Sequence, residues 1–331
     1  MIRICIVGAS GHGVQVFRDC KGRDDVRFVA AAPGSVGENI DSLFPMMKQF
    51  GGDPKSYDSY REMLKREKPD IVIVDNYYGD HGAVNISALE AGCHIFSEKP
   101  VATSLDQLAL IREKYYSAGV EMTAMLDFRY NGAFYKAWQL IQEGEIGEVR
   151  LLSAQKSYKL GTRPPFTGDR KTYGGTILWV GIHGIDWISW MSGAKFLSVT
   201  SAQSSLYNCG HGTLEMSAIA QYQMDHEILA SLTMDYFNPP QAPVHGDDRI
   251  RVVGTRGVLE ILKNSLTLIN PDGDGIRQVA CPADEYPFSS FLDQIEGKGK
   301  CRVSFEDVYK TTEAALKTQL SADTKTAVRF D

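Results

Sequence analysis

The stretch IRICIVGASGHG, residues 2–13, decides the fold of the first part of this chain. Up to Val7 it is an almost continuous apolar run, the pattern of a strand buried on both faces of a parallel sheet. Glycines follow at once, and a helical pattern begins at Val14. Glycines in such a turn let the backbone approach a pyrophosphate, and the next helix offers unpaired N–H groups to its charge. The turn therefore predicts a dinucleotide site made by Gly8, Ser10, Gly11, His12 and Gly13, in which Ser10 replaces the usual middle glycine.

Short apolar runs alternate with helical patterns through the first 125 residues. The further apolar runs are Phe28–Ala32, Ile71–Val74, His94–Ser97 and Val120–Met125. The helical patterns are Val14–Cys20, Tyr57–Glu67, Val84–Ala91 and Leu105–Ala118, the last with Thr103 or Ser104 as N-cap and Gly119 at its end. Apolar strands that alternate with helices predict a doubly wound parallel sheet of the Rossmann type.

The pattern changes after residue 125, where segments of period two dominate. These segments are Val149–Tyr158, Leu197–Leu206, Ser217–Gln223, Ile228–Tyr236, Ile250–Val253, Val258–Ile261 and Ser265–Ile269, with helical patterns at Phe134–Glu143, Ile177–Met191 and Phe305–Leu320. Alternation of apolar and polar residues indicates antiparallel strands with one wet face. The predicted fold class is α/β: a Rossmann domain in residues 1–125, then an α/β domain with a large, mainly antiparallel open sheet in residues 126–331.

Composition excludes several classes of function. The 331 residues include 35 basic and 41 acidic side chains, with a net charge of −6, so the surface has no electrostatic reason to hold nucleic acid. No apolar run reaches the roughly 18 residues of a membrane helix, and no secretory signal is visible. The six cysteines are scattered, without a CxxC pair or zinc-ligand spacing. We expect free thiols in a reducing cytoplasm, no metal, no membrane and no nucleic-acid partner.

The second apolar run ends in Ala31-Ala32-Pro33-Gly34-Ser35, without the carboxylate that binds the adenosine ribose in many NAD sites. Asp24 and Asp25 come too early in the chain to supply it, and Glu38 too late. No arginine directly follows the strand that could bind the 2′-phosphate of NADP either. NAD and NADP therefore both remain open, with weak discrimination expected or with a preference set elsewhere in the chain.

Ser97-Glu98-Lys99-Pro100 follows the fourth apolar run. A lysine at the carboxyl end of a parallel strand lies where doubly wound sheets bind ligands, and Glu98 can hold that lysine or a cofactor hydroxyl. Together with the glycine turn, Gly144-Glu145-Ile146-Gly147, and Gly174-Gly175 leading to His183, this sequence closely resembles the Gfo/Idh/MocA family of glucose–fructose oxidoreductase and inositol dehydrogenase. The resemblance covers essentially the whole chain.

The resemblance implies that residues 1–125 bind NAD or NADP and that residues 126–331 bind substrate and form a homodimer or homotetramer. It implies hydride transfer between nicotinamide and a carbinol or ketone carbon of a sugar, inositol or related polyol. Lys99 matches the family lysine that contacts substrate and cofactor, and His183 matches the histidine that often serves as acid or base. Asn76 and Tyr77 stand in the segment that passes under the nicotinamide, and the histidine of that segment is kept as His81.

Trp179 stands four residues before His183, where the family often carries an aspartate. The spacing of Trp179, His183, Asp186 and Trp190 places them on one helix face. Two interpretations are open: a core histidine satisfied by Asp186, or a substrate-facing acid/base that Asp186 orients and Trp179 flanks. The family position favours the second.

The basic segment between Lys159 and Gly175 also has two interpretations. It is either a solvated surface loop or a site where Lys159 or Arg163 recognises a carboxylate or phosphate of the substrate.

The leading functional hypothesis is an NAD(P)-dependent oxidoreductase that acts on a small polyol or sugar-like substrate. The alternative is a redox-inactive family member that binds a ligand or partner as a sensor. The missing aspartate at Trp179 and the altered segment Asn76-Tyr77-Tyr78 motivate it. A third hypothesis keeps the cofactor for elimination or glycosidic cleavage through a transient ketone.

Overall fold

The computed structural model describes residues 1–330, which divide into two compact units. The first unit contains residues 1–125, 171–174 and 286–312. The second contains residues 126–170, 175–285 and the chain from 313 onward. The chain therefore returns twice to the first unit, at residues 171–174 and 286–312. The predicted division into the consecutive segments 1–125 and 126–331 does not contain these two returns.

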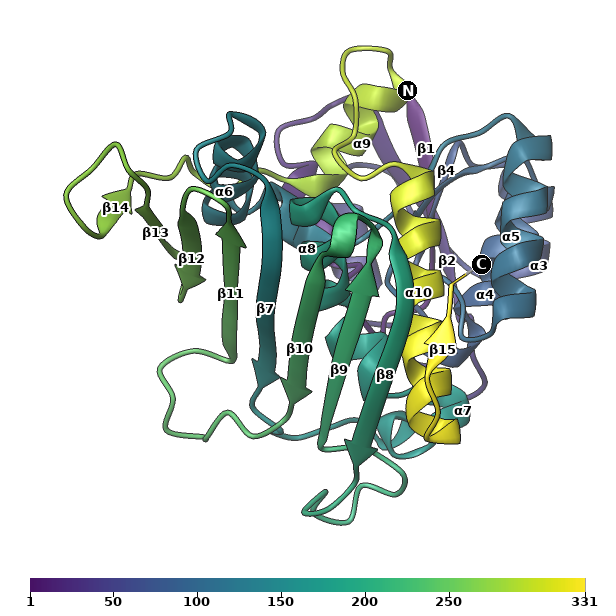
Figure 1. Ribbon diagram of the computed structural model, residues 1–331. Helices are drawn as coiled ribbons and strands as arrows, with labels where there is room; N and C mark the ends of the chain where they lie inside the picture. Colours follow the sequence, from purple (N-terminus) through teal and green to yellow (C-terminus); the bar gives the residue numbers. More distant parts are fainter. Residues whose placement is uncertain (331) are drawn as a thin grey trace. The chain divides into compact units, whose positions relative to one another are not determined.

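The first unit is built on a six-stranded sheet in the order β3-β2-β1-β4-β5-β6, and every neighbouring pair is parallel (Figure 1). Its strands are β1 (Ile2–Val7), β2 (Val26–Ala32), β3 (Lys55–Ser56), β4 (Ile71–Val74), β5 (His94–Ser97) and β6 (Met122–Ala124). All four residues of β4 are buried, because helices cover both faces of the sheet. The predicted doubly wound parallel sheet is confirmed.

The helices of this unit are α1 (Gln15–Asp19), α2 (Leu43–Lys48), α3 (Tyr60–Glu67), α4 (His81–Glu90), α5 (Leu105–Ala118) and α9 (Pro287–Ile295). Helix α5 begins and ends where the sequence predicts: the Ser104 hydroxyl accepts the Gln107 N–H, and Gly119 closes the helix at φ 67°. Helix α9 was not predicted. Its Phe288 and Phe291 pack on Phe96 of β5. This contact joins residues far apart in the sequence, so it depends on the tertiary fold and leaves no local pattern.

The second unit is built on a nine-stranded sheet in the order β14-β13-β12-β11-β7-β10-β9-β8-β15. Its strands are β7 (Val149–Tyr158), β8 (Phe196–Ser204), β9 (Ser217–Met224), β10 (Leu229–Asp235), β11 (Gly246–Gly254), β12 (Val258–Leu262), β13 (Ser265–Ile269), β14 (Arg277–Val279) and β15 (Val328–Arg329). Only β7 and β10 run parallel, so the predicted mainly antiparallel sheet is confirmed. Strand β11 begins earlier than predicted, because its polar first half pairs with the polar end of β7.

Helices cover one face of this sheet and leave the other open (Figure 1). They are α6 (Gly132–Gln142), α8 (Ile182–Ser192) and α10 (Phe305–Thr324), of which α10 starts in the first unit. The remaining helical elements of the two units are the short helix α7 (Arg170–Tyr173) and the 3₁₀ turns Tyr78–Asp80, Asp127–Tyr130, Pro165–Gly168 and Asp225–Glu227. The predicted helix at Ile177–Met191 opens with a π-helical turn, Ile177–Gly181, and continues as α8. In residues 1–330 no cysteine forms a disulfide, and no helix has the length and apolar character needed to cross a bilayer.

Candidate functional site

The loop Gly8–Gly13 lies at the carboxyl ends of β1, β4 and β5, and its glycines are required by close packing. Gly8 has φ 88°, and a Cβ there would lie 2.3 Å from the backbone of Asn76. A Cβ on Gly11 would lie 2.6 Å from Asp75 Oδ1, and one on Gly13 would lie 2.6 Å from Asp75 Cγ. These glycines let the loop backbone pack directly on Asp75 and Asn76 in front of α1, the position at which the sequence predicts a pyrophosphate site.

Glu98 fastens this loop to the end of β5. Its Oε2 accepts the His12 N–H and faces His12 Nδ1, both at 2.9 Å, while Oε1 accepts the Lys99 N–H at 3.0 Å. The Lys99 ammonium lies 3.6 Å from Oε1 and is only 2% exposed. Burial opposes ionisation of Glu98, but His12 and Lys99 outweigh it and lower the pKa of Glu98 to about 2. Lys99 is therefore held as a buried ammonium beside an ionised carboxylate.

The sequence placed Glu38 too far along the chain to reach the glycine loop, but the structure brings its carboxylate there. The loop after β2 folds back, and Glu38 Oε2 accepts the N–H groups of Gly34 at 2.9 Å and Ser35 at 3.3 Å. Its Oε1 accepts the Ala9 N–H at 3.1 Å and the Ser10 hydroxyl at 2.5 Å. A carboxylate that the sequence spacing excluded thus lies directly against the glycine loop.

Three predicted cofactor residues lie behind the loop. Asn76 and Tyr77 both donate to the Ser35 hydroxyl, Asn76 through its side chain at 3.3 Å and Tyr77 through its backbone at 3.2 Å. His81 is fully buried, and its ring nitrogens lie 2.7 Å from the Pro100 carbonyl and 2.9 Å from the Asn76 carbonyl. His81 therefore ties the turn after Lys99 to the segment after β4, a positioning role that its place in the sequence did not reveal.

In the second unit, His183 lies on α8 against an aromatic cluster. It is 5% exposed, and its ring meets that of Phe128 edge-on at 5.3 Å. Trp187 also belongs to this cluster, and the centre of its ring lies 4.7 Å from that of Phe128. Trp179 is buried in the π-helical turn that precedes α8. Gly181 and Gly184 form the side of this helical segment that packs on Met234 and Leu232 of β10, whereas His183 meets Phe128 of the turn Asp127–Tyr130. That Trp179 shares one helix face with His183 stays a prediction, because Trp179 lies in the π-helical turn before α8.

Asp186 has a strong partner that the sequence did not suggest. Arg129 donates to it from Nε at 3.2 Å and from Nη2 at 2.7 Å, and both side chains are buried. The Arg129 guanidinium also lies 5.4 Å from the centre of the Trp190 ring. This pair joins α8 to the turn at Asp127–Tyr130. The prediction that Asp186 orients His183 remains a prediction.

A second buried ion pair was also missed. Lys156 on β7 is 2% exposed, and its ammonium lies 2.7 Å from Asp248 Oδ2 and 4.4 Å from the ring centres of Phe128 and Tyr158. Burial lowers the pKa of Lys156, and Asp248 opposes that shift. A signal existed in the sequence, because Lys156 occupies an inward position of a strand whose other inward residues include Leu152 and Ala154. The pair places charge beside the Phe128 ring that His183 also touches.

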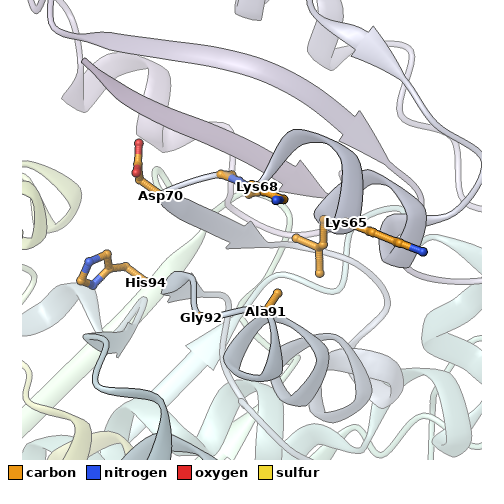
Figure 2. A pocket seen from close by; sticks show the side chains of 8 residues that line it. Lys65, Lys68, Asp70, Ala91, Gly92 and His94 are labelled. Atoms are coloured by element: carbon orange, nitrogen blue, oxygen red, sulfur yellow. The ribbon is translucent and has the colours of Figure 1, made fainter.

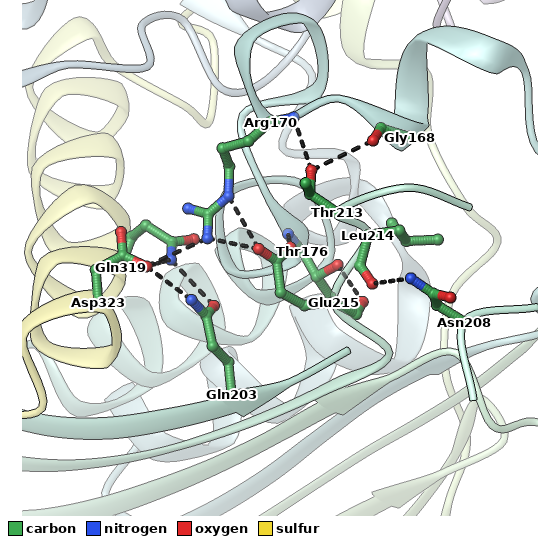
Figure 3. Close-up of polar contacts among 10 residues, drawn as sticks. All are labelled: Gly168, Arg170, Thr176, Gln203, Asn208, Thr213, Leu214, Glu215, Gln319 and Asp323. Atoms are coloured by element: carbon green, nitrogen blue, oxygen red, sulfur yellow. Dashed lines mark hydrogen bonds and ion pairs between the residues drawn. The ribbon is translucent and has the colours of Figure 1, made fainter. Parts of the chain in front are cut away.

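The basic segment is mostly structural. Lys159 donates to the carbonyls of Pro240 and Ala242, at 3.0 and 2.5 Å. The Arg170 guanidinium lies between Glu215 and Asp323, at 2.5 and 3.2 Å from their carboxylates (Figure 3). These contacts do not favour the interpretation of Lys159 as a substrate-binding group, and Arg170 forms ion pairs within its own unit.

Arg163 remains as the candidate from this segment. It donates to the Lys159 carbonyl at 2.8 Å and stacks on Tyr236 at 4.4 Å.

A hollow at the other edge of the parallel sheet is not the cofactor site. Figure 2 shows it between the amino ends of β4 and β5, lined by side chains that include Lys65, Lys68, Asp70 and His94. Doubly wound sheets bind ligands at the carboxyl ends of their strands, which is the opposite edge.

Comparison with known proteins agrees with this arrangement. Residues 2–123 match the family model for an oxidoreductase family with an NAD-binding Rossmann fold, and residues 134–260 match the GFO/IDH/MocA C-terminal domain. A solved structure from Thermotoga maritima, itself assigned only as an oxidoreductase, is 42% identical, with a TM-score of 0.94 over 99% of this chain and 100% of that one.

Relatives of known activity are more distant. A scyllo-inositol 2-dehydrogenase (NAD(+)) of Bacillus subtilis is 28% identical over 70% of this chain and 68% of its own length. A D-xylose 1-dehydrogenase (NADP(+)) of Haloferax volcanii is 25% identical over 85% of this chain and 86% of its own. Four other relatives are matched over only 47–60% of their own length.

Proposed function

Because the chain belongs to the GFO/IDH/MocA family of oxidoreductases, we propose that it transfers hydride between a nicotinamide dinucleotide and a carbinol or ketone carbon of a sugar, inositol or related polyol. The observation that carries the proposal is the glycine cradle Gly8–Gly13 together with the buried Lys99 ammonium at the carboxyl edge of the same sheet. The names of the inositol and xylose dehydrogenase relatives support the substrate class.

The residues at this edge fit a dinucleotide. The loop amides after Gly8 would hold the pyrophosphate, since the glycines let the loop backbone pack directly on Asp75 and Asn76 at the carboxyl ends of the strands. When bound, the nicotinamide ring supplies or accepts the hydride. Glu98 and the loop do not themselves react; they hold the backbone and Lys99 in place.

We also propose that NAD is preferred over NADP, in place of the weak discrimination expected from the sequence. Glu38 presents a carboxylate against Ala9 and Ser10. A carboxylate accepts hydrogen bonds from the ribose hydroxyls and repels a 2′-phosphate.

Lys99 and His183 take the chemical roles in this proposal. The Lys99 ammonium stabilises negative charge that develops on the substrate oxygen as hydride leaves. His183 accepts the hydroxyl proton in oxidation and returns it in reduction. Trp179 and Arg163 line the substrate region, and Asp186 with Arg129 holds α8 so that the histidine keeps its direction.

The test is a turnover screen. The protein is incubated with NAD⁺ or NADP⁺ and a panel of polyols and sugars, and formation of the reduced nicotinamide is followed by absorbance. Lys99→Ala should lower turnover by about 100- to 10,000-fold while NADH still binds. Lys21→Ala serves as the matched control, because Lys21 is exposed on the same unit.

One observation favours the alternative of a redox-inactive sensor: Trp179 replaces an acid of the usual catalytic set. A sensor would bind dinucleotide and a sugar-like ligand but show no hydride transfer with any member of the panel. Turnover that Lys99→Ala abolishes would exclude it.

We further propose a homodimer or homotetramer formed through the open face of the nine-stranded sheet. Leu151 and Leu229 pair across β7 and β10 on that face and are 45% and 52% exposed. Light scattering should report two or four chains, and the double variant Leu151→Glu/Leu229→Glu should report fewer. A wild-type monomer would contradict this part of the proposal.

A further inference from the structure

Asp75 lies directly beneath the glycine loop. It follows β4, where its N–H donates to the Val7 carbonyl at 2.8 Å and its carbonyl accepts the Ser10 N–H at 2.7 Å. These bonds point its side chain into the loop, where Gly11 and Gly13 have no room for a Cβ because the carboxyl group is there. Asp75 is 0% exposed. It is therefore part of the floor of the proposed pyrophosphate site.

Within the described chain no group makes a well-formed hydrogen bond to either carboxyl oxygen of Asp75, and the backbone N–H of Gly13 is the donor that faces it. The neighbouring Glu98 is the opposite case, because His12 and Lys99 compensate its charge. An ionised carboxylate that is buried without a counter-ion is strongly disfavoured. Because Glu98 is the carboxyl held against His12 and Lys99, Asp75 is the one that keeps a proton. Burial first, and then the charge of Glu98, raise the pKa of Asp75 well above its usual value.

We propose that Asp75 is a positioning residue which must be a neutral acid for the dinucleotide to bind, so that cofactor affinity is linked to one proton. The inference rests on the proposed function and concerns the same site. The charged or titratable groups that face Asp75 are Glu98 from the end of β5, His12 from the loop and Glu38 from the loop after β2.

The physical reason lies in the loop amides. A bound pyrophosphate would accept hydrogen bonds from the N–H groups of the loop. An ionised Asp75 beneath the loop would compete for the same N–H groups, and its negative charge would repel that of the pyrophosphate. With Asp75 neutral, binding moves no proton. Above the pKa of Asp75 in the free protein, binding must take up one proton from solvent, so affinity falls by about tenfold per pH unit.

The experiment compares the wild-type protein with Asp75→Asn, a neutral side chain of the same shape. NADH affinity is measured from about pH 6 to about pH 10 by fluorescence and by calorimetry in buffers of different ionisation enthalpy. Near neutral pH the two proteins should bind NADH within about threefold of each other. Toward alkaline pH the wild type should lose affinity relative to Asp75→Asn and should take up a proton on binding. Asp53→Asn, at an exposed carboxylate, is the matched control and should follow the wild type.

A second measurement does not depend on the cofactor. The infrared spectrum of the ligand-free wild type at neutral pH should contain a protonated carboxyl band that Asp53→Asn keeps and Asp75→Asn loses. If Asp75→Asn does not fold, titration of this band in the wild type replaces the comparison.

Absence of the band near neutral pH would overturn the proposal. A change of tenfold or more in NADH affinity on Asp75→Asn at that pH would do the same, as would parallel pH profiles up to about pH 10. If neither protein binds NADH, the proposed function fails, while the band still tests the protonation of Asp75.

Discussion

Glu38→Gln should shift the cofactor preference of this protein toward NADP. In the structure the Glu38 carboxylate is half-buried and holds two groups of donors, one on the loop after β1 and one after β2. A carboxylate and one phosphate charge about 5 Å apart repel by about 3 kcal/mol at an effective dielectric constant of about 20. Solvent screening at a half-buried site reduces this repulsion to about 1.4–3 kcal/mol. Removing it should therefore raise the ratio of NADPH to NADH affinity by about 10- to 150-fold.

The same substitution should loosen the free loop. A glutamine side chain can accept from only one of the two donor groups, and its own NH₂ then faces the other. An unsatisfied donor at such a site costs about 1–3 kcal/mol, so the melting temperature should fall, and NADH should restore part of the loss.

The assay is direct titration of both reduced cofactors against the wild type, Glu38→Gln and Glu62→Gln, an exposed control on α3. The control should keep the wild-type ratio. If Glu38→Gln leaves the ratio of the two affinities unchanged, the carboxylate is only a loop brace and the ribose is read elsewhere.

Four further outcomes are expected. Gly8→Val should abolish NADH binding, measured by titration, because its Cβ would lie 2.3 Å from the backbone of Asn76; unchanged affinity would place the site elsewhere. His183→Ala should lower turnover by about 100- to 10,000-fold with NADH affinity retained, and full turnover on the true substrate would make this histidine structural. Glu98, whose pKa is lowered from 4.5 to about 2, contributes stability above pH 4.5 that is lost as pH falls toward 2, roughly 3 kcal/mol in total; acid unfolding of wild type and Glu98→Gln should converge over that window. Arg129→Met should destabilise the second unit by about 3–5 kcal/mol in denaturant unfolding, because it removes the cation that pairs with the buried Asp186 carboxylate, and adding Asp186→Leu should recover part of that loss.

Local patterns predicted most of the elements. Helix α5 carries its own start and stop signals in Ser104 and Gly119, and the strand before Gly8 is apolar without interruption, so neither needs distant contacts to be recognised. The weaker elements were missed for the opposite reason. Strands β14 and β15 are only three and two residues long, and helix α9 packs on Phe96, a residue far away along the chain.

The candidate site divides in the same way. The loop Gly8–Gly13 and Lys99 could be predicted, because each directly follows a strand of a parallel sheet and such strand ends meet at one edge. The pairing of Arg129 with Asp186 and of Lys156 with Asp248 could not, since partners so far apart in the chain become neighbours only through the packing of α8 and the pairing of β7 with β11.

By itself, then, the sequence determined the doubly wound sheet, the mainly antiparallel second sheet and the dinucleotide loop, because hydrophobic period and glycine placement are local properties. Only the tertiary structure decided which carboxylates serve that loop. Glu38 reaches it through a fold-back of the segment after β2, and Asp75 is buried beneath it without a counter-ion of its own. Both are ordinary acidic residues in the sequence, and only the surroundings that folding provides give one its contacts with the loop and raise the pKa of the other.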